Sequence, residues 1–196
     1  MGETDEALMR AVRGGELSHL AALFDRYHLV LFGFLTRMTG SRHVAEDLVQ
    51  EVFLRILKYR ATFRDDARFE TWIYRIARNA RVDYVAKRRE EEPLGEEISE
   101  LLAGGPGPDD EIERERDVVL LQTALLRLRE DRRELIVLAR YQEMKHEAIA
   151  DLLGVDTGTV KVRIHRAMKE LRDTFLRLVE RPPCDAKTSR RNPSII

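Results

Sequence analysis

Residues 146–171 read HEAIADLLGVDTGTVKVRIHRAMKEL, a pattern that predicts two short helices joined by a tight turn. Apolar residues recur at helical spacing in both halves, and Gly154 stands at the turn between them. Asp156 and Thr157 precede the second helix, where their side chains can cap free backbone N–H groups. Gly158 leaves room there for a phosphate or another backbone. We therefore predict a helix-turn-helix.

The outward side of the second helix is polar and basic. When its apolar stripe faces the core, the opposite side carries residues that suit a polyanion: Thr159, Lys161, Val162, His165, Arg166 and Lys169. A helix of this kind can enter a DNA major groove.

Length and composition allow two small domains or one of medium size, since 43% of the 196 residues are hydrophobic. No apolar run approaches the length needed to span a bilayer, and the acidic start MGETDEALMRA does not resemble a signal peptide. The single cysteine, Cys184, allows neither an internal disulfide nor a cysteine metal cluster. We expect a cytoplasmic protein without membrane insertion.

The whole chain carries helical periodicity and no strand signal, so we predict an all-α fold of two small helical domains joined by a flexible linker. Four helices, at about 5–13, 18–39, 42–60 and 71–89, would form a first domain, residues 1–89. The second domain, 118–179, would consist of two helices and the helix-turn-helix, and the tail 180–196 is expected to be disordered.

Residues 90–117 separate the two predicted domains. The formal net charge of the chain is -1, but this segment holds twelve acidic and only two basic residues and includes the run AGGPGPDD. Such a composition favours a linker over a folded unit.

Aromatic residues in a basic setting mark the region around the fourth predicted helix. Phe63 and Phe69 lie in a polar loop, and Trp72 follows, with Arg75, Arg78 and Asn79 predicted to face outward. Composition alone favours a packed helix with arginines for solubility. The alternative is a nucleic-acid platform in which exposed aromatic rings hold unstacked bases.

Catalytic patterns are absent from the sequence. There is no glycine-rich phosphate loop and no pair of catalytic carboxylates, and the zinc-protease pattern that begins at His146 fails because position 150 is alanine. We expect no enzyme, no metal site and no cofactor.

The order of these parts resembles that of bacterial RNA polymerase sigma factors of the extracytoplasmic-function class, within the sigma-70 family. The resemblance covers about residues 20–178. AEDLVQEVFLRI at 45–56 is similar to the family's polymerase-binding helix, FETWIYRIARNARVDY at 69–84 to its promoter-melting helix, and residues 146–171 to its minus-35 reader.

The resemblance implies partners and roles for individual residues. The first domain would correspond to sigma region 2 and the second to region 4, and the chain would direct core RNA polymerase to promoter DNA. Contacts to the clamp helices of polymerase would come from Asp47, Gln50, Glu51 and Arg55. The minus-10 element would meet a base-binding loop at 63–70, with Phe63, Phe69, Trp72, Arg75, Arg78 and Asn79.

In the second domain, the resemblance implies that the recognition helix contacts the minus-35 element while the helices before it sit on the polymerase flap. The implied minus-35 residues are Thr157, Thr159, Lys161, Val162, His165, Arg166 and Lys169. The family also implies an anti-sigma factor as a further partner. The acidic linker would either run toward the RNA exit channel or act as a plain spacer, and both interpretations stay open.

Two other functions remain as alternatives. The first is a helix-turn-helix transcriptional regulator that binds duplex DNA as a dimer, and the second is a helical interaction protein. Residues 45–89 argue against a regulator because aromatic residues expected to be exposed beside arginines have no use in a dimerisation domain.

Overall fold

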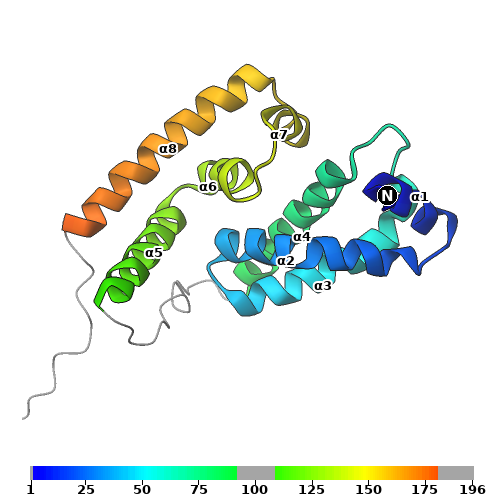
Figure 1. Ribbon diagram of the computed structural model, residues 1–196, viewed down its shortest axis with the longest axis horizontal. Coiled ribbons are helices and arrows are strands. Elements are labelled where there is room, and N and C mark those ends of the chain that lie inside the picture. Colours follow the sequence, from blue (N-terminus) through cyan, green and yellow to red (C-terminus); the bar gives the residue numbers. More distant parts are fainter. Residues whose placement is uncertain (1, 92–108, 181–196) are drawn as a thin grey trace, which may run out of the picture.

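The computed structural model describes residues 2–91 and 109–180, and all its regular elements in that part of the chain are helical (Figure 1). The all-α prediction is confirmed. Within the described residues, no helix is both long and apolar enough to cross a membrane.

The first four α-helices form an N-terminal unit. They are α1 (Asp5–Gly14), α2 (His19–Thr39), α3 (Arg42–Tyr59) and α4 (Phe69–Glu91), with a short 3-10 turn η1 (Arg60–Thr62) after α3. Gly15 and Gly40 adopt left-handed φ values of 104° and 79° at the ends of α1 and α2. Ser41 caps α3 by accepting the Val44 N–H at 3.3 Å. These residues account for helix boundaries close to those predicted near residues 13, 39 and 42.

α4 begins at Phe69, two residues before the predicted start at Thr71. Phe69 is fully buried, and its backbone N–H donates to the Glu6 carboxylate at 3.1 Å. The Trp72 N–H already bonds to the Arg68 carbonyl. A side chain distant in sequence therefore accepts a free backbone N–H in the first turn of α4. No local capping pattern could reveal this contact.

The remaining helices form a C-terminal unit. They are α5 (Asp109–Arg127), α6 (Glu130–Ile136), the π-helical segment η2 (Val137–Tyr141), α7 (His146–Leu153) and α8 (Thr157–Glu180). Gly154, at φ 65°, ends α7 and makes the turn of the helix-turn-helix, as predicted.

The predicted linker 90–117 extends too far at its C-terminal end, because α5 begins at Asp109. The predicted helix start at Val118 is wrong for the same reason. The acidic stretch that suggested a linker therefore includes the first residues of α5. The rest of that linker and nearly all of the predicted tail lie outside the described residues.

The two units pack against each other in this structure. α2 lies against α5, α6 and η2, while α4 lies against α7, and buried residues of both units belong to one continuous hydrophobic cluster. α8 contacts α5, α6 and α7, and it runs along the side of the C-terminal unit away from α1 and α3 (Figure 1).

Candidate functional site

The outer face of α8 is open to solvent. Val160, Ile164, Ala167 and Leu171 are buried against the rest of the C-terminal unit. The opposite residues, which we call the α8 outer face, are all exposed: Lys161, Val162, His165, Arg166 and Lys169. The exposed side chain of Arg163 adjoins this face, and the sequence prediction omitted it. The α8 outer face therefore combines cationic side chains with the imidazole of His165 and the two methyl groups of Val162.

Asp156 caps the N-terminus of α8. Its carboxylate accepts the Thr159 backbone N–H at 2.7 Å and also the Thr159 hydroxyl. These hydrogen bonds lower the pKa of the Asp156 carboxyl. The hydroxyl of Thr159 is therefore held by the cap, whereas the sequence had assigned it to a base edge.

The space beside Gly158 is also part of this cap. A Cβ placed on Gly158 would come within 3.0 Å of Asp156 Oδ1. The glycine thus makes room for the capping carboxylate, where the sequence suggested room for a phosphate or another backbone. Thr157, the first residue of α8, is only partly exposed.

The three aromatic residues predicted to hold bases are buried. Phe63 and Phe69 are 1% and 0% exposed and Trp72 is 8% exposed. Their rings pack together, with centroids 5.3 Å apart for Phe63 and Trp72 and 6.2 Å for Phe63 and Phe69. The burial agrees with the packed helix that composition favours. The alternative of exposed stacking rings is wrong here, because edge-to-face packing and burial favour a core under the loop.

The part of that loop that faces solvent is polar. Residues 64–68, which we call the loop tip, carry Arg64, Asp65, Asp66 and Arg68 on the surface, with Ala67 half-buried. Arg64 pairs with Asp66 at 2.9 Å across the tip.

The outward arginines of α4 contact the C-terminal unit. Arg78 Nε donates to Glu134 at 2.6 Å, and Arg75 donates to the Asp151 carbonyl at 3.4 Å. Arg81, which is buried, pairs with Glu130. Residues assigned to the minus-10 strand are therefore engaged within the protein.

Further polar contacts join the two units. The Tyr74 hydroxyl donates to Gln142 at 2.6 Å, and burial raises the pKa of this tyrosine well above its ordinary value. Arg133 reaches from α6 to the Met38 carbonyl at 2.7 Å. The guanidinium of Arg37 lies 4.2 Å from the ring centroid of Tyr141. Asn79, by contrast, remains exposed on α4.

The polar face of α3 contains both exposed residues and residues that join it to α4. Asp47 and Gln50 are exposed. Arg55 donates to Glu51 at 2.6 Å and to Asp83 of α4 at 2.7 Å, so it joins two helices. Leu54 lies on the same face and is 62% exposed, a position that the sequence analysis did not single out.

Comparison with known proteins gives matches for both units. Residues 23–91 match the model of Sigma-70 region 2, and residues 118–171 match that of Sigma-70, region 4. The ECF RNA polymerase sigma factor SigW of Bacillus subtilis is 31% identical over an alignment of 173 residues that covers 84% of this chain and 92% of SigW. The ECF RNA polymerase sigma factor SigL of Mycobacterium tuberculosis is 32% identical over an alignment of 175 residues that covers 88% of this chain and 97% of SigL.

The chain belongs to the ECF class of the sigma-70 family. It is a sigma factor, a subunit that directs RNA polymerase to promoters, and the resemblance found in the sequence is confirmed. The alternative of a dimeric regulator is not supported.

Solved structures of similar fold are known for other sigma factors. CnrH, in complex with the cytosolic domain of CnrY, has a TM-score of 0.64 at 24% identity, covering 92% of this chain and all of that chain. RpoE, in complex with the anti-sigma factor NepR from Bartonella quintana, has a TM-score of 0.65 at 23% identity, covering 80% and 96%. At these identities the likeness concerns the fold alone.

On the sigma factor described here, the region 2 match ends with α4 and the region 4 match ends within α8. The open outer face of α8 thus lies in region 4, and the loop tip lies in region 2. α1 precedes both matches.

Proposed function

We propose that this sigma factor contacts its promoter through two surfaces, the α8 outer face at the minus-35 element and α4 with the loop tip at the minus-10 element. The observation that carries the proposal is the α8 outer face, which is basic and uncovered in the region 4 part of the chain. Regions 2 and 4 would act as two domains, with the second starting at α5.

In the minus-35 contact, Arg166 and Lys161 would bind guanine edges or phosphates and His165 a base edge. Val162 offers methyl groups to a thymine. Lys169 and the additional Arg163 extend the cationic surface toward phosphates. Asp156, Thr157 and Thr159 shape the end of the helix that enters the groove.

In the minus-10 contact, exposed Asn79 and the loop tip would approach the separated strand. Arg75 and Arg78 would take phosphates once they leave their partners in the C-terminal unit. The rings of Phe63, Phe69 and Trp72 would support the loop from below. Stabilising even one unpaired base offsets part of the few kcal/mol that unstacking costs.

The polymerase contact would use the α3 face that holds Asp47, Gln50 and Glu51. We add Leu54 to this surface, because an exposed leucine among polar groups gains free energy when a partner covers it. Arg55 would act indirectly, through its ion pairs with Glu51 and Asp83. The helices before α8 would rest on the flap.

In this structure the N-terminal and C-terminal units pack against each other, which we call the closed arrangement. We infer that the two units separate when the chain binds polymerase. Arg78 donates to Glu134 and Arg75 to the Asp151 carbonyl, so both guanidinium groups would be only partly available to a DNA phosphate while the units stay packed together. The proposed minus-10 surface would therefore become available when the units separate.

An anti-sigma factor is a further proposed partner, because the RpoE relative is bound by one in its solved structure. The chain would act in the cytoplasm, where promoter DNA and polymerase meet, as a transcription initiation factor without catalysis of its own.

Run-off transcription with core polymerase and a broad promoter library tests the proposal. We expect promoter-specific transcripts only when the chain is added. Transcription that does not depend on either promoter element, or the absence of transcripts from every promoter in the library, would contradict the proposal.

A further inference from the structure

α1 lies outside the residues that match region 2, yet it holds both ends of the loop that this region presents to DNA. The inference that follows rests on the proposed minus-10 contact. It concerns residues that precede the family match at residue 23.

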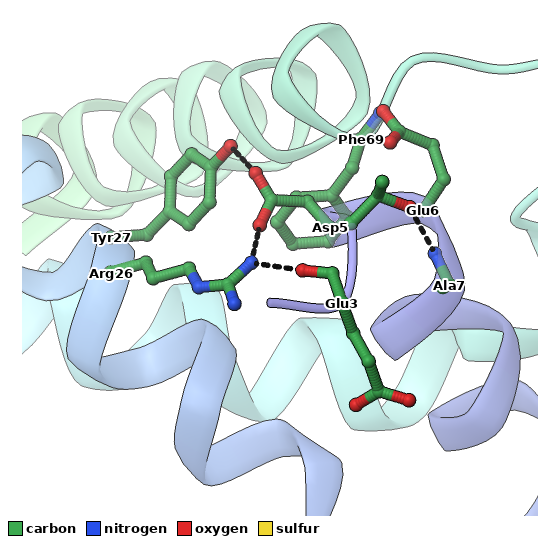
Figure 2. Close-up of polar contacts among 8 residues, drawn as sticks. Glu3, Asp5, Glu6, Ala7, Arg26, Tyr27 and Phe69 are labelled. Atoms are coloured by element: carbon green, nitrogen blue, oxygen red, sulfur yellow. Dashed lines mark hydrogen bonds and ion pairs between the residues drawn. The ribbon is translucent and has the colours of Figure 1, made fainter. Parts of the chain in front are cut away.

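α1 is itself fixed in place. Its inner residues Leu8, Met9 and Val12 are buried, and the Thr4 hydroxyl caps its first turn by accepting the Ala7 N–H. Figure 2 shows the Asp5 carboxylate between Arg26 and Tyr27 of α2, accepting a hydrogen bond from each. The helix is therefore a rigid support joined to α2.

Arg13 holds the first end of the loop. Its Nη1 donates to the Phe63 carbonyl at 2.7 Å, and its Nη2 donates to Asp65 at 2.6 Å. Asp65 belongs to the exposed loop tip, whereas Phe63 is buried. One guanidinium thus connects the tip to the core beneath it.

Glu6 holds the second end. Its carboxylate accepts the backbone N–H of Phe69, the residue at which α4 begins, at 3.1 Å (Figure 2). An acidic group at this position suits the positive end of the α4 dipole. The five residues of the loop tip are consequently suspended between two anchors on the same helix.

We propose that Arg13 and Glu6 are positioning residues for minus-10 recognition: α1 fixes where the loop tip meets the unpaired strand. Discrimination among bases requires a pocket that is already formed, because a mobile loop loses free energy in becoming ordered on each DNA strand. Neither residue needs to touch DNA for this role.

The test is run-off transcription by the reconstituted holoenzyme on promoters with an intact minus-35 element and single substitutions in the minus-10 element. Glu6→Ala should reduce the preference for the intact minus-10 element about two- to tenfold, the range for loss of one hydrogen bond. Arg13→Met, which loses two hydrogen bonds, should reduce it by at least as much. Glu6→Gln should keep most of the preference, because its amide oxygen can accept the same N–H.

Arg10→Met is the matched control, since Arg10 is exposed on α1 and contacts neither end of the loop. It should leave the preference unchanged. Thermal melting of each variant separates positioning from folding, because loss of stability alone lowers all transcripts together.

Unchanged minus-10 preference in both Arg13→Met and Glu6→Ala, with a wild-type protein that discriminates normally, would overturn this inference and leave the proposed function standing. An equal effect of Arg10→Met would overturn it too. If the wild-type holoenzyme itself fails to discriminate at minus-10, the proposed function falls and the inference with it.

Discussion

Arg55 and Leu54 are neighbours on α3 with opposite environments. The side chain of Arg55 is 20% exposed and bonds to Glu51 and to Asp83 of α4, whereas Leu54 is 62% exposed. Arg55 joins two helices and so contributes to the stability of the fold, while Leu54 would contribute to binding when a partner covers it. The two residues therefore separate stability from the proposed polymerase contact on one surface.

Replacing Arg55 with methionine should lower the free energy of unfolding by about 1–3 kcal/mol, because the carboxylates of Glu51 and Asp83 lose a charged donor. Leu54→Lys should change stability by less than about 0.5 kcal/mol. It should nevertheless weaken binding to core polymerase roughly tenfold, as expected when one apolar side chain no longer becomes buried. Urea unfolding and anisotropy titration with core polymerase measure the two quantities.

Leu176→Lys provides the control, since Leu176 is an exposed leucine of α8 away from α3. Equal weakening of polymerase binding by Leu54→Lys and Leu176→Lys would show that the α3 face has no special part in it.

Residue type alone did not reveal which side chains are exposed and which are buried or paired within the protein. For Phe63, Phe69 and Trp72, composition favoured a packed helix and left exposed stacking rings as the alternative, and the structure buries all three side chains. The polar loop that holds Phe63 and Phe69 carries no helical period from which their burial could be deduced. The pairing of Arg78 with Glu134 joins residues far apart in the chain, so only the folded structure could show it.

At the scale of single helices, local chemistry determined most boundaries. Glycines end α1, α2 and α7, and Ser41 and Asp156 cap the starts of α3 and α8. The roles of Gly154 and Asp156 were predicted from the sequence. The starts of α4 and α5 were missed for different reasons. The start of α4 is capped by Glu6, which is distant in sequence. The start of α5 lies in an acidic stretch without helical periodicity.

The cap of α8 should influence stability and DNA binding together. Asp156→Ala removes the acceptor for the Thr159 N–H and hydroxyl, so the melting temperature should fall and minus-35 binding should weaken. Asp156→Asn should retain most of both, because its amide oxygen can still accept. Calorimetry and binding to a duplex minus-35 fragment provide the measurements.

The pH dependence of this cap follows from the lowered pKa of Asp156. A carboxyl whose folded pKa is depressed stabilises the fold above its ordinary pKa of 3.8, and this stabilisation disappears as the pH falls through the lower folded value. The melting difference between wild type and Asp156→Ala should therefore be constant near neutrality and shrink in acid. A difference that grows in acid would contradict the cap.

For the whole molecule, the contacts between the two units decide which surfaces are available. Glu134, 5% exposed, holds Arg78, and Gln142 holds the Tyr74 hydroxyl. Both contacts involve α4, the element proposed to meet the minus-10 strand. The contacts that join the two units and the proposed minus-10 contact thus both use side chains of α4.

Glu134→Gln combined with Tyr74→Phe should weaken this closure by about 1–3 kcal/mol, because one charged and one neutral hydrogen bond are reduced or lost. We expect a larger radius of gyration in X-ray scattering and tighter binding of single-stranded minus-10 DNA by the free protein. Glu147→Gln, which neutralises an exposed acid on α7, is the charge-matched control. If the double variant had the same radius of gyration and the same DNA affinity as this control, the closed arrangement would not be what limits DNA binding by the free protein.

The division of promoter contacts between α8 and α4 is tested most directly by transcription with holoenzymes that contain wild-type chain, Arg166→Ala or Asn79→Ala. Each is assayed on promoters altered at minus-35 alone or at minus-10 alone. Arg166→Ala should lose about 1–3 kcal/mol of discrimination at minus-35 and keep its minus-10 preference, while Asn79→Ala should show the reverse. If either variant lost preference at the other element, or at both equally, the assignment of the two surfaces would be wrong.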